Sequence, residues 1–199
     1  MLSLPDIEAL FARHGAAQYS GEPVTQVEHA LQTAHLAEQA GAGDALVTAC
    51  LLHDLGHLLN EQGDTPSSRG IDDTHQYFAL PFLRGLFPDA VLEPIRLHVD
   101  AKRYLCHANA GYHARLSEDS KRSLRLQGGV FDTVQAATFM NQGGASDALL
   151  LRQWDDLAKQ ADLATPSLAH FLGRAARCAI AQPSPQPSPT STRERVRAR

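Results

Sequence analysis

The chain has few cysteines, no long apolar run and no segment in which polar and apolar residues alternate. Its three cysteines are widely spaced along 199 residues, which argues against a disulfide framework and a thiolate zinc site. The first residues lack a basic region followed by an apolar stretch, and no apolar run approaches a membrane-spanning length. We therefore expect no signal peptide, no membrane-spanning segment and a location in the reducing cytoplasm.

Negative charge dominates the chain once its last residues are set apart. The whole sequence carries −4, and residues 183–199 hold four arginines against one glutamate, a net of +3, so residues 1–182 carry −4 − 3 = −7. An acidic body argues against a nucleic-acid-binding surface, and a small anionic substrate would need a local cationic pocket. We expect one domain over 1–182 and a disordered tail rich in Pro, Ser and Arg over 183–199, whose deletion leaves activity unchanged.

Helical signals recur along the acidic body. Thr25 and Glu28 form a capping box, Gly41 marks the end of that helix, and Asp44 caps a helix whose apolar centre indicates burial. The predicted helices cover residues 5–13, 25–40, 44–60, 72–86, 90–99, 117–127, 130–141, 145–160 and 167–181, with non-helical segments at 15–23 and 61–70. Because no alternating strand pattern of useful length competes with these signals, the sequence predicts an all-α fold.

Metal-type side chains are the most informative feature of the sequence. His53 and Asp54 are adjacent in an apolar run, and His29, His75 and His98 lie on separate predicted helices. Imidazole and carboxylate together bind first-row divalent metals, and the two oxygens of Asp54 could bridge a pair of them. A single helix histidine is more often an ordinary core or surface residue, so the prediction of a metal site depends on the whole set.

The order H…HD…H…H…D resembles the HD-domain superfamily of helical metalloproteins. Its final aspartate comes late in the chain, and Asp155 is the candidate, with its neighbour Asp156 expected to face solvent. The resemblance implies an HD-domain helical bundle with a buried dinuclear metal site. Most members are phosphohydrolases, in which a metal-bound water attacks a phosphate ester.

Local motifs extend the resemblance, over residues 15–160, to the PhnZ-type mixed-valence di-iron oxygenases, which cleave the carbon–phosphorus bond of 1-hydroxyphosphonates. The motifs are Tyr19-Ser20-Gly21-Glu22 before His29, His53-Asp54-Leu55-Gly56-His57, His98 with Lys102, a serine-rich helix start from Ser117 leading to Leu126-Gln127-Gly128-Gly129, and Arg152-Gln153-Trp154-Asp155-Asp156. Any one motif is weak, but their combination at compatible spacing is specific to this group.

This resemblance implies two iron ions, an Fe(II)/Fe(III) pair, with dioxygen as the co-substrate. The implied ligands are Asp54 as the bridge, His29, His53 and Asp155 on one iron, and His75 and His98 on the other. The second iron would have fewer protein ligands and therefore open positions for the substrate.

The same resemblance implies catalytic and substrate-binding roles. Tyr19 and Glu22 would lie on a loop that closes the site, where Tyr19 occupies an iron position until substrate displaces it and Glu22 meets a substrate amine. The implied substrate contacts are Glu22, His57, Lys102, Ser120, Gln127 and Arg152. A phosphonate dianion favours guanidinium, ammonium and helix-start donors, so these residue types fit such a ligand. The expected reaction converts a substrate such as 2-amino-1-hydroxyethylphosphonate into phosphate and glycine.

Two other functions stay open on the sequence: a metal-dependent phosphohydrolase acting on a nucleotide or phosphomonoester, and a non-enzymatic metal-binding module. Among phosphonates, Glu22 favours an amino-bearing substrate. A trimethylammonium analogue would need more aromatic surface, and hydroxymethylphosphonate would need no acid. The expected partner is a small organophosphonate rather than nucleic acid or membrane. The resemblance also implies an upstream 2-oxoglutarate-dependent hydroxylase in the same pathway, without a stable complex.

Overall fold

The computed structural model describes residues 1–19, 21–60 and 66–180, and within them the regular structure is helical, which confirms the all-α prediction. In chain order the helices are α1 (Leu4–His14), α2 (Gln26–Gln39), α3 (Asp44–Leu52), α4 (Leu55–Leu59), the 3-10 helix η1 (Pro66–Arg69), α5 (His75–Phe78), α6 (Leu80–Leu83), α7 (Asp89–Ala108), α8 (Tyr112–Arg115), α9 (Glu118–Leu126), α10 (Thr133–Met140), α11 (Ala145–Leu157) and α12 (Leu168–Cys178). The tail expected at 183–199 lies outside the described residues, as do Ser20 and residues 61–65.

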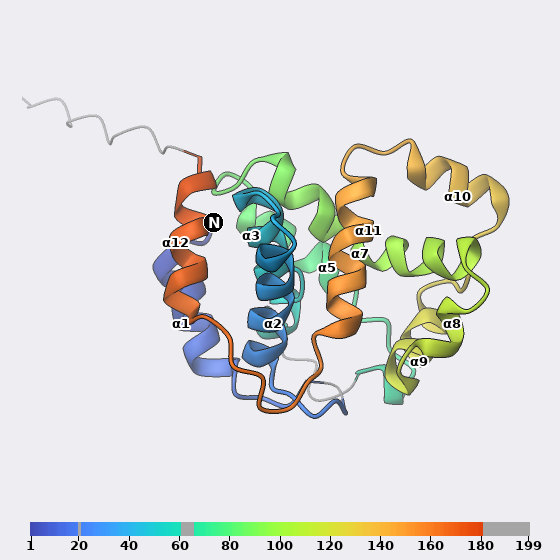
Figure 1. Ribbon diagram of the computed structural model, residues 1–199, viewed down its shortest axis with the longest axis horizontal. Coiled ribbons are helices and arrows are strands. Elements are labelled where there is room, and N and C mark those ends of the chain that lie inside the picture. The colour runs from blue at the N-terminus through green and yellow to red at the C-terminus, as the bar shows by residue number, and fades with distance from the viewer. Residues whose placement is uncertain (20, 61–65, 181–199) are drawn as a thin grey trace, which may run out of the picture.

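Helices α7 and α11 lie between two groups of helices. Helices α1, α2, α3 and α12 gather on one side, and α8, α9 and α10 on the other (Figure 1). Helix α7 packs against both α11 and α3, so it contacts the first group as well as the middle of the molecule. Because the predicted metal-type residues belong to α2, α3, α5, α7 and α11 or to their ends, this arrangement can bring them together.

Small residues let α2 approach α3 closely. Ala30, Ala34 and Ala37 recur at helical spacing and are buried, which leaves one face of α2 almost flat. This face meets the apolar α3, where Val47 and Leu51 are likewise buried. The capping box of Thr25 and Glu28 is confirmed at the start of α2 and fixes where that helix begins.

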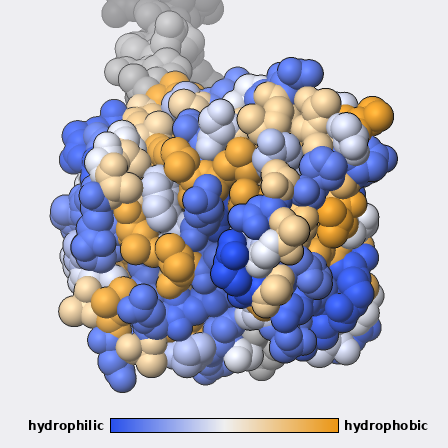
Figure 2. All heavy atoms as spheres, turned by 45° about the vertical axis from the view of Figure 1, so that its right-hand side comes forward, coloured by the Kyte–Doolittle hydropathy of each residue, from blue (hydrophilic) through white to orange (hydrophobic). Residues whose placement is uncertain are grey.

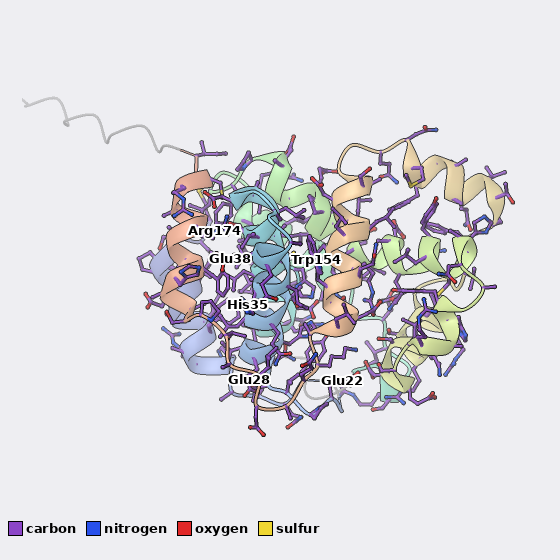
Figure 3. The ribbon with its side chains drawn as sticks, viewed as in Figure 1. Glu22, Glu28, His35, Glu38, Trp154 and Arg174 are labelled. Atoms are coloured by element: carbon purple, nitrogen blue, oxygen red, sulfur yellow. The ribbon has the colours of Figure 1, made fainter. Side chains whose placement is uncertain are left out.

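Ion pairs fasten α12 to the first group of helices. Arg174 and Glu38 point toward each other (Figure 3), and the guanidinium Nη1 lies 2.6 Å from the carboxylate Oε1. The same arginine donates from Nε to Asp44 at 2.6 Å, and Arg177 also pairs with Asp44. Asp44 is not the cap that the sequence predicts, because Gly43 is the N-cap and, within the described residues, no side chain caps the helix; the Asp44 carboxylate instead belongs to an ion-pair network that links α3 to α12.

The helix predicted over 44–60 is interrupted at the His-Asp pair. Helix α3 ends at Leu52, α4 begins at Leu55, and Asp54 between them has φ −102° and ψ 12°. The ring of His53 turns back to donate from Nδ1 to the carbonyl of Cys50 at 2.8 Å. This break corrects the prediction of one continuous helix over 44–60, and it places His53 at the end of α3 and His57 in α4.

The segment predicted as a helix over 72–86 is also broken. Thr74 has a left-handed φ of 48°, so α5 begins only at His75, and Pro81 lies at the start of a separate helix α6. Conversely, the helix predicted over 90–99 begins at Asp89, runs on to Ala108 and contains Pro94 in its interior. The short helix α8 was not predicted from the sequence.

Polar and apolar side chains are interspersed on the face drawn in Figure 2. No helix within the described ranges combines the length and the apolar character that crossing a bilayer requires.

Candidate dinuclear metal centre

Two buried groups of metal-type side chains lie next to each other in the middle of the molecule. Within each group the potential ligand atoms all lie within 4.8 Å of one another, close enough for one ion. The first group is His29, His53 and Asp155, and the second is Asp54, His75 and His98. The structure therefore brings together all six residues that the sequence predicts as metal ligands.

The histidines are held so that their Nε2 atoms face inward. A carbonyl or carboxylate oxygen can only accept a hydrogen bond, so the Nδ1 atom next to it must carry the proton. The Nδ1 bonds are His29 to Ala158 O at 2.8 Å, His53 to Cys50 O at 2.8 Å, His75 to Asp73 Oδ1 at 2.8 Å and His98 to Ile95 O at 2.7 Å. Outer hydrogen bonds of this kind orient metal-binding imidazoles and fix their tautomers.

The inward-facing nitrogens crowd together in pairs. The Nε2 atoms of His29 and His53 lie 3.2 Å apart, and those of His75 and His98 lie 3.0 Å apart. Two nitrogen lone pairs at such a distance need a proton or a metal cation between them. The two pairs are thus the strongest geometric sign of two cation sites.

Asp54 stands between the two pairs and offers one oxygen to each. Its Oδ2 lies 3.6 Å from His29 Nε2 and 3.4 Å from His53 Nε2. Its Oδ1 lies 3.2 Å from His75 Nε2 and 3.6 Å from His98 Nε2. This placement is the one that a carboxylate bridging two ions requires.

The carboxylates of the site are ionised and partly without partners. Burial opposes ionisation of Asp54, but the neighbouring histidines, led by His53, hold its pKa well below the usual range. Burial likewise opposes ionisation of Asp155, while Arg152 and His29 lower its pKa well below the usual range. Within the described residues, the buried atoms Asp54 Oδ2 and Asp155 Oδ1 have no hydrogen-bond partner.

The donor set fits a pair of first-row divalent or trivalent metals. It consists of imidazole nitrogens and carboxylate oxygens with no thiolate, a set that suits iron, manganese, nickel or zinc. The unpartnered carboxylate oxygens and the crowded ring nitrogens all point into the same buried space. A cation in each group would satisfy both, because buried charges are otherwise costly.

A pocket that holds two cationic side chains, Lys102 and Arg152, together with carboxylates adjoins the second metal group. Lys102, Arg152, Ser120, Gln127 and His57 line one cavity together with Asp54, His75 and His98. The first three are buried, so their polar atoms face this cavity rather than bulk solvent. The predicted substrate contacts, apart from Glu22, thus meet at one place beside the metal groups.

Lys102 is a buried ammonium with a neutral partner. Its side chain is 3% exposed, and Nζ donates to Ser123 Oγ at 2.8 Å. Burial, reinforced by the nearby positive charge of Arg152, lowers the pKa of Lys102 to about 7. Within the described chain no carboxylate pairs with it, so an anion in the cavity would find this charge available.

Arg152 is held in place by two carboxylates. Its Nη1 lies 2.7 Å from Asp155 Oδ2, and its Nη2 pairs with Asp156. Asp156 also accepts a hydrogen bond from the Tyr112 hydroxyl, which in turn accepts one from Arg152 Nε at 3.3 Å. Asp156 is therefore not the solvent-facing residue that the sequence predicts, because its carboxylate contacts Arg152 and Tyr112.

Tyr19 covers the first metal group. Its ring stacks on that of His29, with centroids 3.9 Å apart and planes 13° from parallel, and it lines the cavity. Burial, followed by the charge of Asp54, raises the pKa of Tyr19 well above its usual value. A neutral phenol beside the metal groups fits the predicted residue that substrate displaces.

Glu22 is placed differently from the other predicted substrate contacts. Its Oε1 lies 2.9 Å from Lys159 Nζ, and it lies near the end of α11 in Figure 3. Lys159 Nζ also reaches toward Ser117 Oγ at 3.4 Å and lies 5.9 Å from the centre of the Tyr19 ring. Glu22 is not among the residues that line the cavity, and its charge is already matched by an ammonium.

Several residues of the site were not predicted from the sequence. They are Asp73, which contacts His57 and His75, Ser123 beside Lys102, Tyr112 beside Arg152, and Lys159 beside Glu22. Each acts on a predicted residue rather than forming a pattern of its own. Gly56 belongs to the predicted His53–His57 motif. Its lack of a side chain lets the backbone of His75 pack closely against it, since a Cβ there would lie 2.2 Å from the His75 carbonyl oxygen.

Comparison with known proteins gives the class of the protein. The sequence model of the HD domain matches residues 27–127, which span α2 to the end of α9 and contain five of the six predicted metal ligands. The chain therefore belongs to the HD-domain family.

Two curated relatives narrow the class further. The chain is 39% identical to 1-hydroxy-2-(trimethylamino)ethylphosphonate dioxygenase (glycine-betaine-forming) of Leisingera caerulea over 165 residues, 83% of this chain and 84% of the relative. It is 43% identical to hydroxymethylphosphonate dioxygenase of Gimesia maris over 170 residues, 85% of this chain and 84% of the relative. These relatives confirm the predicted resemblance to the PhnZ-type oxygenases, and the chain is an oxidoreductase of the HD superfamily.

Proposed function

We propose that this protein is a di-iron oxygenase that uses dioxygen to cleave the carbon–phosphorus bond of a small 1-hydroxyphosphonate. The observation that carries the proposal is the position of Asp54, with one oxygen toward each pair of histidines and with the cavity that holds Lys102 and Arg152 at the second pair. The dioxygenase activity of both curated relatives supports the choice of oxygenase over hydrolase.

The metal-binding roles follow the two groups of side chains. His29, His53 and Asp155 would hold one iron, His75 and His98 the other, and Asp54 both. When bound, the metal pair would supply the redox chemistry with dioxygen that no protein side chain offers. The second group has fewer protein ligands and adjoins the cavity, so the C1 hydroxyl and the phosphonate would bind on that side, while Tyr19 covers the first group.

The remaining residues of the cavity would bind the phosphonate. Lys102 supplies a positive charge that no carboxylate neutralises, and Arg152 supplies the N–H groups left over from its carboxylate partners. Ser120 lies in the first turn of α9, where helix N–H groups and the helix dipole favour an anion, and His57 and Gln127 complete the wall. A dianion bound there would be oriented with C1 toward the metal groups.

The overall reaction balances without an external reductant. One dioxygen is consumed for each 1-hydroxyphosphonate, C1 passes from the alcohol to the carboxylic acid level, and the phosphorus leaves as inorganic phosphate. Both oxygen atoms are fully reduced by electrons from the substrate. Hydroxymethylphosphonate would give formate, and 2-amino-1-hydroxyethylphosphonate would give glycine.

The Glu22–Lys159 ion pair bears on the tail of the substrate. An amino-bearing tail would have to displace Lys159 from Glu22, and breaking a half-buried pair costs binding energy. Hydroxymethylphosphonate has no cationic tail and can be accommodated with the pair intact. We therefore propose hydroxymethylphosphonate as the first substrate to test and 2-amino-1-hydroxyethylphosphonate as the second.

The experiment compares aerobic and anaerobic turnover of these two compounds by iron-loaded protein. The proposal expects one phosphate released for each dioxygen consumed and no phosphate without dioxygen. A phosphomonoester, offered in parallel, should remain intact. Phosphate release from the monoester under anaerobic conditions, with the phosphonates untouched, would show that the protein is a phosphohydrolase instead.

A further inference from the structure

Asp73 touches two functional histidines at once. Its Oδ2 lies 2.9 Å from Nδ1 of His57, and its Oδ1 lies 2.8 Å from Nδ1 of His75. His57 lines the cavity, and His75 belongs to the second metal group. One carboxylate, 12% exposed in its side chain, thus joins a predicted substrate contact to a predicted metal ligand.

The backbone around Asp73 is bent to allow this contact. Thr74 adopts a left-handed conformation with φ 48° and ψ 30°, which is costly for a β-branched residue. The bend lets Asp73 Oδ1 reach both the ring of His75 and its backbone N–H, at 2.8 Å and 3.4 Å. Strain of this kind persists where surrounding contacts hold it, and here those contacts are the two imidazoles.

The two imidazoles are also stacked on each other. Their ring centres lie 4.1 Å apart and their planes are 25° from parallel, so both Nδ1 atoms face the same carboxylate. An ionised carboxylate accepts at both oxygens, so it binds both rings only when each carries a proton on Nδ1. The Nε2 atoms then point away from Asp73, that of His75 toward His98 and that of His57 toward Asp54.

We propose that Asp73 is a positioning residue that fixes the tautomer and the orientation of both His57 and His75. It makes Nε2 of His75 the metal-binding atom and presents Nε2 of His57 to the cavity. For His57 this rests on the proposed function, since the cavity is the proposed phosphonate site. For His75 it rests on metal binding alone.

The same three side chains could instead be taken as a third ion site. Suitable atoms of His57, Asp73 and His75 lie within 4.8 Å of one another. However, both oxygens of Asp73 are already hydrogen-bonded to ring nitrogens at normal lengths, and the Nε2 of His75 is directed to the second group. The contacts thus describe a hydrogen-bonded support, and a third ion becomes an outcome that the experiment can detect.

The experiment uses zinc, which is diamagnetic, as the metal probe on the full chain. Zinc binding to wild-type protein and to Asp73→Asn is measured by titration calorimetry, and the ring nitrogens of zinc-loaded protein are assigned by long-range ¹H–¹⁵N NMR. An asparagine oxygen can accept from only one of the two rings, while its amide must donate to the other. We expect zinc affinity at one of the two sites to fall about 10–100-fold, and the His57 ring to change tautomer.

Asp72→Asn is the matched control. It removes the same charge one residue earlier in the chain, and its Oδ1 contacts the Thr74 N–H at 3.3 Å rather than either imidazole. This variant should bind both zinc ions as the wild type does. Asp73→Glu, which keeps the charge but lengthens the side chain, should fall between the wild type and Asp73→Asn.

Several results would overturn the inference. They are a wild-type protein in which Nδ1 of either histidine lacks a proton, an Asp73→Asn variant that binds two zinc ions unchanged, or three zinc ions bound per chain. The NMR measurement on wild type needs no variant, so it decides even if Asp73→Asn does not fold. This experiment measures zinc binding and tautomers, not turnover. If the separate turnover experiment finds no phosphonate cleavage, the proposed function is refuted, but the role of Asp73 at His75 remains intact.

Discussion

The Nε2 atoms of His75 and His98 lie 3.0 Å apart although the two residues come from different helices, α5 and α7. Both are buried, and both carry an outer hydrogen bond on Nδ1. Thr74 therefore adopts a left-handed conformation, and the helix predicted over 72–86 is broken there, so that the two basic nitrogens come face to face. A cation bound between the two nitrogens would account for this arrangement.

Replacing Asp54 by Ala should remove both metal ions from the protein. Among the residues that the structure describes, this carboxylate is the group that faces both pairs of histidines, so its loss leaves each ion with fewer ligands and with more uncompensated charge. Metal content per chain, measured by inductively coupled plasma mass spectrometry after iron loading, should fall from two ions to near zero.

The matched control for Asp54 is Asp100→Ala. Asp100 lies two residues after His98 on α7 but pairs with Arg103 at 3.2 Å, away from the metal groups. This variant should retain two irons. An Asp54→Ala protein that also retains two irons would refute the bridging role.

Lys102 and Arg152 should differ when each is replaced by Ala. Lys102 contacts a neutral serine, so its loss should weaken phosphonate binding by about 10–100-fold while the irons remain. Arg152 is the partner of Asp155, so its loss should weaken substrate binding and also reduce iron content. Steady-state KM values, paired with metal analysis of the same samples, would check this. Equal iron loss in the two variants would contradict the distinction.

Lys102 should lower the free energy of unfolding of the protein when no substrate is bound. A folded-state pKa of about 7 instead of 10.5 means that the charged form is disfavoured by burial, so the folded protein binds fewer protons than the unfolded chain between pH 7 and 10.5. The contribution of Lys102 to the free energy of unfolding should therefore become less unfavourable as the pH rises through this window.

Lys102→Met removes this cost, and we expect it to stabilise the substrate-free protein at pH 7 by on the order of 3 kcal/mol. Urea unfolding at several pH values would measure the effect. The difference between wild type and variant should shrink toward pH 10. A variant that is less stable than wild type at pH 7 would show that Lys102 is buried without a penalty.

Phosphonate binding should follow the charge of Lys102 in the opposite direction. Because the ammonium form prevails below a pKa of about 7, kcat/KM should decline as the pH rises above this value. Lys102→Arg, whose guanidinium stays charged, should decline less over the same range. If the pH profile of kcat/KM is the same in both proteins, the decline above pH 7 comes from the titration of a group other than Lys102.

Lys159→Met should change the preference between substrate tails. Without the ammonium, Glu22 keeps an unmatched charge, so 2-amino-1-hydroxyethylphosphonate should gain about 10-fold in kcat/KM relative to hydroxymethylphosphonate. Glu22→Gln combined with Lys159→Met should abolish that gain. If the ratio of the two kcat/KM values stays the same in Lys159→Met, the Glu22–Lys159 ion pair does not determine which substrate tail the protein prefers.

The sequence predicted the metal groups because their chemistry is local. The His53-Asp54 dipeptide and the spacing of His29, His75 and His98 are visible in the chain, and the structure brings them together. The helix break at Asp54 was not visible, since the surrounding residues are apolar helix formers. It arises from the site itself, where the ring of His53 turns back to the Cys50 carbonyl.

The supporting residues could not be predicted because they depend on contacts between distant segments. Lys159 lies 137 residues from Glu22 along the chain, and Tyr112 lies 40 residues from Arg152. An aspartate next to another aspartate, as at Asp73, gives no sign that it supports two imidazoles. Such roles follow from packing of α5 and α11 against the rest of the fold, which periodicity alone does not define.

Mössbauer spectroscopy of protein loaded with ⁵⁷Fe is the sharpest test of the proposed di-iron centre. We expect two iron sites per chain that are magnetically coupled through Asp54 as a mixed-valence pair, and a change in the spectrum of one site when hydroxymethylphosphonate is added without dioxygen. A single uncoupled iron, or a pair whose spectrum ignores every 1-hydroxyphosphonate, would contradict this proposal.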